Sequence, residues 1–192
     1  MLIKDWKKDV FTIPNILSLF RLLLIPVYIR IYLNASEPGD YVLAGTILAV
    51  SCLTDLVDGL IARHFNQISN LGKLLDPIAD KFTQLALVVC LSVRYPALYY
   101  VLAAFLTKEF VQFAIALIKF RQGKVLPGAI PAGKICTTVL FSSLTLMVLL
   151  PDAELWLVNT VTAIDFLFLV YAFVRYLFAF LGKNAKTEDL QL

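Results

Sequence analysis

Four aspartates in two closely spaced pairs are the residues of this sequence that could do chemistry. They are Asp55, Asp58, Asp76 and Asp80. The first pair is spaced i,i+3 and the second i,i+4, so in helices each pair lies on one face. The surrounding residues are strongly apolar, and a charge at the centre of a membrane costs about 2.5–3.5 kcal/mol on insertion scales. Carboxylates in such segments must pair with cations, bind ions or line a wet cavity.

Carboxylates confined to one pocket repel one another, so either some are protonated or cations lie between them. Mg²⁺ takes oxygen ligands, usually one or two carboxylates completed by water and substrate phosphates. Four aspartates could hold two such ions, which would clamp a pyrophosphate and its leaving group. Gly59, directly after Asp58, permits close approach, and Arg63 about a turn further on suits a phosphate. The residues therefore predict a metal-dependent phosphoryl or phosphatidyl transferase at a membrane face.

The run from Asp55 to Asp80 resembles the signature of the CDP-alcohol phosphatidyltransferases, D-x2-D-G-x2-A-R-x8-G-x3-D-x3-D. Every fixed position and every spacing of that signature is present. The resemblance implies transfer of a phosphatidyl group from CDP-diacylglycerol to an acceptor hydroxyl, with release of CMP, by a homodimer in the membrane. It also implies that the four aspartates hold two Mg²⁺ or Mn²⁺ ions and that Asp80 is the general base.

The resemblance further assigns residues to the CDP-lipid. Those expected to contact it or to permit close packing beside it are Asp55, Asp58, Gly59, Ala62, Arg63, Ser69 and Gly72. The opening segment from Ile13 to Arg21 is similar to the I-P-N-x-L-T-x-x-R start of bacterial phosphatidylglycerophosphate synthases. By that similarity Asn15 could reach the nucleotide, and Arg21 could meet an acidic group.

The same similarity favours glycerol 3-phosphate as the acceptor. Those synthases usually carry an R-E pair and then a second arginine on span four, where this chain has Lys108-Glu109 and Ala116. The cations that could bind the acceptor instead are Arg21, Lys108, Lys119, Arg121 and Lys134. This departure leaves open a cardiolipin synthase that uses phosphatidylglycerol, or another CDP-alcohol phosphotransferase. A cation-coupled transporter is a more distant alternative, because its site should lie near the bilayer midplane.

The elements that must position these residues are apolar helices. Of the 192 residues, 60% are apolar and 16% are charged, against about 45–50% and about 25% in soluble domains. A membrane-spanning helix needs about 20 mostly apolar residues, and six stretches qualify: 14–33, 41–63, 74–94, 97–119, 132–150 and 155–181. The sequence thus predicts an all-α integral membrane protein with six spans, forming a single domain over residues 1–192. The net charge of +3 is too small to indicate a nucleic-acid partner.

The connection between the second and third spans is about ten residues long, so these spans should be antiparallel neighbours whose aspartate pairs face each other. Orientation follows the distribution of lysine and arginine. Eleven lie on the side of both termini, against Arg94 alone on the other: Lys4, Lys7, Lys8, Arg63, Lys73, Lys119, Arg121, Lys124, Lys134, Lys183 and Lys186. Both termini and the active site should therefore face the cytoplasm, in a bacterial cell membrane.

The remaining parts of the sequence have structural interpretations. Residues 1–11 alternate apolar and basic side chains in the manner of an interfacial helix, and residues 183–192 are expected to form a mobile polar tail. The other charges within the spans are expected to form internal ion pairs between helices. These are Arg30, Lys108 with Glu109, Asp165 and Arg175.

Overall fold

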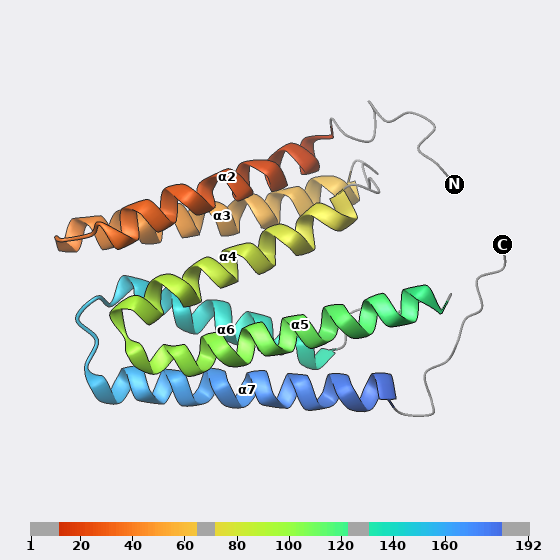
Figure 1. Ribbon diagram of the computed structural model, residues 1–192. Helices are drawn as coiled ribbons and strands as arrows, with labels where there is room; N and C mark the ends of the chain where they lie inside the picture. The colour runs from red at the N-terminus through yellow and green to blue at the C-terminus, as the bar shows by residue number, and fades with distance from the viewer. Residues whose placement is uncertain (1–11, 65–71, 123–130, 182–192) are drawn as a thin grey trace. The chain divides into compact units, whose positions relative to one another are not determined.

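The computed structural model describes residues 12–64, 72–122 and 131–181, except for the side chains of 13–14, 56–64, 73–74, 120 and 180–181. The expected interfacial helix and polar tail lie outside these ranges. The described ranges contain six long helices and one short 3-10 helix (Figure 1). In order they are α2 (Ile13–Leu33), α3 (Pro38–His64), α4 (Gly72–Arg94), η1 (Pro96–Leu98), α5 (Tyr99–Arg121), α6 (Pro131–Leu149) and α7 (Leu155–Leu181).

The all-helical prediction is confirmed for these ranges, and each long helix matches one of the six apolar stretches closely. Within the described ranges, four segments are long and apolar enough to cross a membrane: Asn15–Leu33, Pro96–Lys119, Pro131–Leu149 and Leu155–Ala179. The helices α3 and α4 have 27 and 23 residues, but the aspartate pairs and nearby basic residues lower their hydropathy. The chain is therefore a multi-pass membrane protein.

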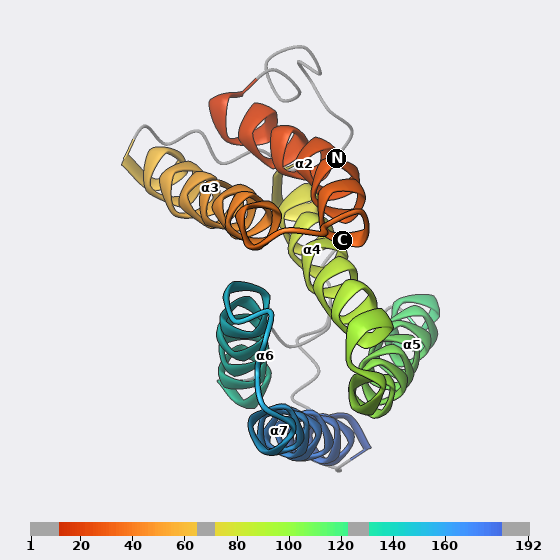
Figure 2. The same ribbon diagram turned by 90° about the vertical axis from the view of Figure 1, so that its left-hand side faces the viewer.

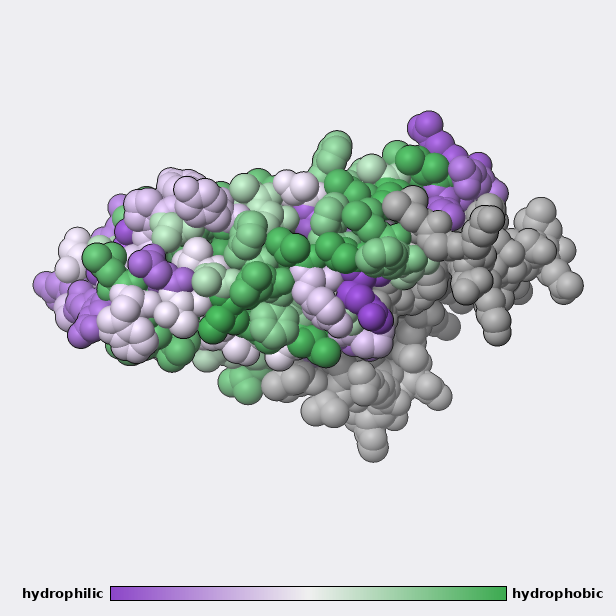
Figure 3. Space-filling model, turned by 90° about the horizontal axis from the view of Figure 1, so that it is seen from below, coloured by the Kyte–Doolittle hydropathy of each residue, from purple (hydrophilic) through white to green (hydrophobic). Residues whose placement is uncertain are grey.

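The surfaces of these helices are apolar, as contact with lipid requires. Only 17% to 33% of each of the four spans is buried inside the protein. Large apolar side chains such as Phe110, Leu155 and Phe178 are more than 70% exposed. Figure 3 shows one face with hydrophobic residues across its middle and hydrophilic residues towards its ends. Exposed apolar surface on this scale is not tolerated in water and marks a membrane-facing protein.

The chain divides into two compact units, and the first comprises residues 1–90 with 145–151. In this unit α2, α3 and α4 lie side by side (Figures 1 and 2), with α2 and α4 running in one direction and α3 in the other. Thr12 caps α2 by accepting the backbone N–H of Asn15, and a proline in the first turn fixes the start of the helix.

Two further packing contacts of the first unit lie away from the aspartates, one between α2 and α3 and one between α3 and the last residue of α6. The rings of Tyr28 and Tyr32 on α2 are buried, and that of Tyr32 meets Tyr41 of α3 edge-on at 5.7 Å between centroids. Gly45 of α3 lies against the side chain of Leu149, and a Cβ atom at this glycine would collide with it. Glycine at this position therefore allows close packing.

The second unit comprises residues 91–144 and 152–192. Its helices α5 and α7 run in one direction, and its part of α6 runs in the other (Figure 1). Leu98, Leu140 and Leu169 are almost completely buried in its core. The Tyr176 hydroxyl of α7 donates to the carbonyl of Gln112 on α5 at 3.2 Å, which fixes these two helices to each other.

Candidate active site

The site begins on a buried polar face of α2. Asn15, Ser18 and Arg21 follow one another at intervals of three residues, so they share one side of the helix. Their side chains are almost entirely buried, with Ser18 at 0% and Arg21 at 2% exposure. Because burying a polar or charged group without a partner is costly, this face must be matched by partners on neighbouring helices.

Arg21 forms ion pairs with two of the predicted site residues, Asp55 and Asp80. Its Nη1 atom lies 2.7 Å from Oδ1 of Asp55 on α3 and 2.8 Å from Oδ1 of Asp80 on α4. One nitrogen atom thus joins carboxylates from two helices, which brings Asp55 and Asp80 close together. The guanidinium of Arg21 therefore supplies a positive charge between the two carboxylates.

Asp76 is held by the same face of α2, one turn earlier. The Ser18 hydroxyl donates to Oδ1 of Asp76 at 2.5 Å. Because α2 and α4 run in the same direction, Ser18 meets Asp76 as Arg21 meets Asp80. The i,i+4 spacing of Asp76 and Asp80 therefore places both carboxylates against α2.

The cluster is closed on one side and open on the other. The side chain of Arg21 is 2% exposed, whereas those of Asp55 and Asp80 are 44% and 51% exposed. Arg21 and Ser18 are buried between the helices, whereas the carboxylates that they contact are accessible to a ligand. We call Ser18, Arg21, Asp55, Asp76 and Asp80 the acidic cluster.

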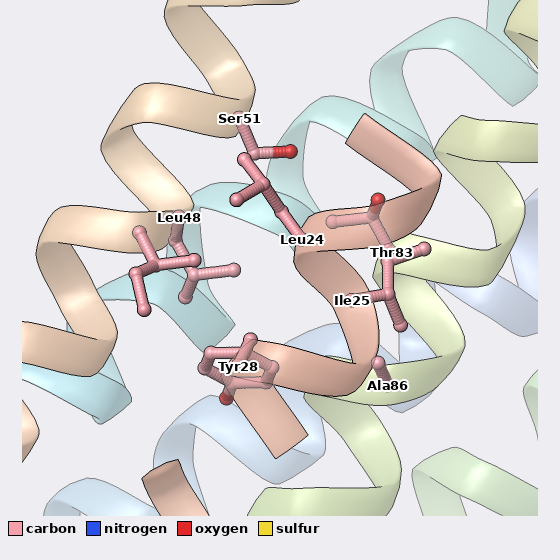
Figure 4. A pocket seen from close by; sticks show the side chains of 8 residues that line it. Leu24, Ile25, Tyr28, Leu48, Ser51, Thr83 and Ala86 are labelled. Carbon is pink, nitrogen blue, oxygen red and sulfur yellow. The ribbon is translucent and has the colours of Figure 1, made fainter. Parts of the chain in front are cut away.

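The helices α2, α3 and α4 also line a small pocket (Figure 4). Along each helix, the pocket lies about one turn from the acidic cluster. Leu24, Ser51 and Thr83 line it, each three or four residues from Arg21, Asp55 and Asp80 respectively. Its other lining residues are Ile25, Tyr28, Ile47, Leu48 and Ala86. The lining carries hydroxyl groups but no charged side chain, so it differs from the acidic cluster one turn away.

The predicted site residues at the end of α3 and in the connection that follows it have side chains outside the described residues. Asp58, Gly59, Ala62 and Arg63 belong to the last turns of α3, but their side chains lie outside the described residues, as does all of Ser69. Gly72 is the buried first residue of α4. Asn15 is buried on the polar face of α2. The roles assigned to these residues remain predictions.

The side chains around the acidic cluster can be compared with the ligands that the expected divalent ions prefer. Among the described side chains, no three acidic, histidine or cysteine groups converge to hold one metal ion. Asp55 and Asp80 nevertheless supply two neighbouring, half-exposed carboxylates, and Mg²⁺ commonly binds through one or two carboxylates completed by water and phosphate. The oxygen-only chemistry and the open side of the acidic cluster fit such ions.

Apart from Arg21, the residues expected to bind the acceptor belong to the second unit. Lys108 is buried and lies 2.5 Å from Oε1 of Glu109, with its ammonium over the ring of Phe105. Lys108 and Glu109 thus form an ion pair within α5, whereas the sequence predicted pairs between helices. Arg121 and Lys134 are exposed on α5 and α6. Their contact with an acceptor, and that of Lys108, stays a prediction.

The expectation of an ion pair is wrong for Asp165 within the described part of the chain. This side chain is completely buried in the second unit, and the Ser143 hydroxyl lies 2.8 Å from each of its oxygens. Its contact is thus with a neutral hydroxyl on α6. Arg30 and Arg175, the other candidates for internal pairing, are exposed.

Ser18 is the site residue that sequence reasoning missed. The signal was present, because Asn15, Ser18 and Arg21 repeat at three-residue intervals in an otherwise apolar stretch. A repeat of this kind indicates a polar stripe facing other helices rather than lipid. Arg21 was identified from the sequence, but its two partners were not.

These features define a helical membrane protein in which three neighbouring helices assemble a half-open acidic cluster. Comparison with known proteins gives its family. The sequence model of the CDP-alcohol phosphatidyltransferase family matches residues 11–173, which is most of the chain and includes all four motif aspartates. The chain belongs to the CDP-alcohol phosphatidyltransferase family and is therefore a transferase of phospholipid biosynthesis.

Relatives that are named for different activities resemble the chain to similar degrees. It is 35% identical over 152 residues to the CMP-forming cardiolipin synthase of Streptomyces coelicolor, covering 78% of this chain and 70% of that protein. It is 33% identical over 139 residues to a probable phosphatidylglycerophosphate synthase of Mycobacterium tuberculosis, covering 71% and 66%. It is 30% identical over 145 residues to the CDP-diacylglycerol–glycerol-3-phosphate 3-phosphatidyltransferase of Escherichia coli, covering 74% and 79%.

Proposed function

We propose that this enzyme transfers the phosphatidyl group of CDP-diacylglycerol to glycerol 3-phosphate, forming phosphatidylglycerophosphate and CMP. The observation that carries the proposal is the acidic cluster, in which three motif aspartates from two helices meet the buried face of α2. The similarity of the opening segment, Ile13 to Arg21, to phosphatidylglycerophosphate synthases supports this acceptor.

The reaction needs a base, and Asp80 is the proposed one. A carboxylate oxygen of Asp80 accepts the proton of the acceptor hydroxyl. The acceptor oxygen then bonds to the β-phosphorus as the bond from that phosphorus to the bridging oxygen breaks, and CMP leaves with the bridging oxygen. Asp55, Asp58, Asp76 and Asp80 would hold two Mg²⁺ or Mn²⁺ ions, which supply positive charge to the diphosphate and to the leaving group.

The positions of the aspartates along α3 and α4 also bear on how the chain crosses the membrane. We propose that α3 and α4 span the membrane as well, which gives six spans with both termini in the cytoplasm. The alternating directions of α2, α3 and α4 agree with successive crossings. The charges of α3 and α4 lie mostly near the ends that carry the aspartates, where the distribution of lysine and arginine predicts the cytoplasmic face of a bacterial cell membrane. Homodimer formation is part of the same proposal.

A cardiolipin synthase is the second candidate, favoured by two observations. Ala116 stands where a phosphate-binding arginine would be expected, and the relative in Streptomyces coelicolor is named a cardiolipin synthase. In that case the acceptor is phosphatidylglycerol. The chemistry at the acidic cluster is the same, so only the acceptor distinguishes the two functions.

The product formed by the purified enzyme tests both candidates. The protein is incubated with labelled CDP-diacylglycerol, Mn²⁺ or Mg²⁺, and either glycerol 3-phosphate or phosphatidylglycerol. We expect phosphatidylglycerophosphate and CMP with the first acceptor only. Cardiolipin formed from phosphatidylglycerol, with no use of glycerol 3-phosphate, would make the second candidate correct.

Metal removal tests the mechanism separately from the acceptor. We expect EDTA to abolish CMP release, and Mg²⁺ or Mn²⁺ to restore it. Ca²⁺ should restore it poorly, because it is larger and takes more ligands than a compact pyrophosphate clamp offers. Full activity of a metal-stripped sample would contradict the assignment of the aspartates to metal binding.

A further inference from the structure

The contacts that α2 makes with the aspartates have a common pattern. The Arg21 ion pairs use Oδ1 of Asp55 and Oδ1 of Asp80, and the Ser18 hydroxyl uses Oδ1 of Asp76. Each carboxylate thus has one oxygen engaged by α2. Both α2 side chains are buried, so the atoms that engage the carboxylates are themselves fixed by packing.

We infer that Ser18 and Arg21 are positioning residues for the divalent ions: they hold one oxygen of each aspartate so that the second oxygen can coordinate metal. The inference rests on the proposed metal dependence and adds to it a helix outside the aspartate motif. Carboxylates that bind metals are generally oriented by hydrogen bonds of this kind, and removing such a partner weakens metal binding about 10–100-fold.

Arginine suits this position for geometric reasons. Asp55 and Asp80 come from different helices and carry like charges, so without a shared cation they repel each other and separate. The rigid guanidinium places one nitrogen within 3 Å of both carboxylates at once. A lysine would keep the charge but lose the fixed planar geometry. This assigns Arg21 to the aspartates rather than to the phosphate of the acceptor.

The direction in which metal affinity changes when Arg21 is removed distinguishes positioning from competition with the divalent ions. If Arg21 instead competed with divalent ions for the carboxylates, its removal would tighten metal binding. If it positions the carboxylates, its removal weakens metal binding. Ser18 carries no charge and cannot compete as a cation, so its substitution isolates the positioning effect.

The experiment measures Mn²⁺ affinity of the full-length, detergent-solubilised protein without lipid substrate, from the electron paramagnetic resonance signal of free Mn²⁺. We expect Ser18→Ala to weaken binding about tenfold and Arg21→Gln up to about 100-fold, with Arg21→Lys between them. Ser143→Ala is the matched control, because it removes a hydroxyl from a part-buried serine–aspartate pair in the second unit. Arg30→Gln, at an exposed arginine of the same helix, is the other control, and both should bind Mn²⁺ as the wild type does.

Circular dichroism and gel filtration of each variant show whether it is folded. If Arg21→Gln does not fold, Ser18→Ala and Arg21→Lys still decide the question, since both are small changes. Unchanged or tighter Mn²⁺ binding by the folded variants would overturn the inference and leave the proposed function standing. A wild-type protein that binds no Mn²⁺ would overturn the metal dependence itself, and the inference with it.

Discussion

At the scale of single residues, the aspartates of the acidic cluster are not equivalent. Asp76 accepts a hydrogen bond from a neutral hydroxyl, whereas Asp55 and Asp80 share a cation. Asp80 is also about half exposed, so a substrate hydroxyl can approach it. A carboxylate that is anchored at one oxygen and open to substrate is suited to accept a proton.

Substituting Asp80 by asparagine should therefore separate proton transfer from metal binding. The amide keeps one oxygen for a metal ion but cannot accept the proton, and loss of a general base costs about 10²–10⁴ in rate. We expect CMP release to fall by at least a hundredfold while Mn²⁺ binding is only weakened. CMP release within tenfold of the wild-type rate would exclude Asp80 as the base.

The acceptor phosphate provides a second test at this scale. Lys134 is exposed at the start of α6, so Lys134→Met removes a charge without leaving a buried partner behind. A charged hydrogen bond is worth about 1.5–3 kcal/mol, so KM for glycerol 3-phosphate should rise about tenfold or more. KM for CDP-diacylglycerol should stay nearly constant.

The control for this test is Arg30→Gln, which removes an exposed charge near the other end of a span. Lys108→Met is less informative, because Lys108 is buried against Glu109 and its loss also disturbs that pair. An unchanged KM for glycerol 3-phosphate in Lys134→Met would remove Lys134 from the acceptor site and strengthen the cardiolipin synthase candidate.

At the scale of helices, the sequence predicted the elements well because their signal is local. Long apolar runs bounded by proline, glycine and charged residues define the spans, and the i,i+3 and i,i+4 spacings place each aspartate pair on one face. The partners of Arg21 were not predictable in this way. Asp80 is 59 residues away from it, and only the packing of three helices brings the two side chains together. The serine that holds Asp165 was missed for the same reason.

Close packing of α3 gives a prediction about stability. Gly45 faces the side chain of Leu149, where a Cβ atom would collide. Alanine gains up to about 1 kcal/mol of helix propensity, and the leucine terminus can shift, so Gly45→Ala should change stability little. The larger branched side chain of Gly45→Ile overpacks the contact and should cost about 1–3 kcal/mol.

Thermal unfolding in detergent measures this effect, with Gly39→Ile as the control. A Cβ atom at Gly39 meets nothing within 4 Å, so the same substitution there introduces no collision. Equal stability of the Gly45→Ile and Gly39→Ile variants would show that the contact with Leu149 does not limit side-chain size.

At the scale of the whole molecule, the proposed six spans make a prediction about accessibility. Single cysteines are placed by Ser36→Cys between α2 and α3, and by Gln122→Cys after α5. The background has Cys52, Cys90 and Cys136 replaced by alanine. A membrane-impermeant maleimide should label Ser36→Cys in intact bacteria, but Gln122→Cys only after the membrane is opened. Labelling of both in intact cells would contradict the proposed orientation.

The buried arginine of α2 has a consequence for how the chain enters the membrane during synthesis. An arginine deep in a lone span costs about 2.5–3.5 kcal/mol, and Arg21 meets Asp55 only after α3 has been made. We therefore expect α2 to insert inefficiently alone and efficiently as a hairpin with α3. A glycosylation-mapping assay of nascent chains should show Arg21→Leu improving insertion of the isolated segment while changing the hairpin little. The side chain that orders the acidic cluster in the folded enzyme would thus also make the first two spans enter the bilayer as a pair.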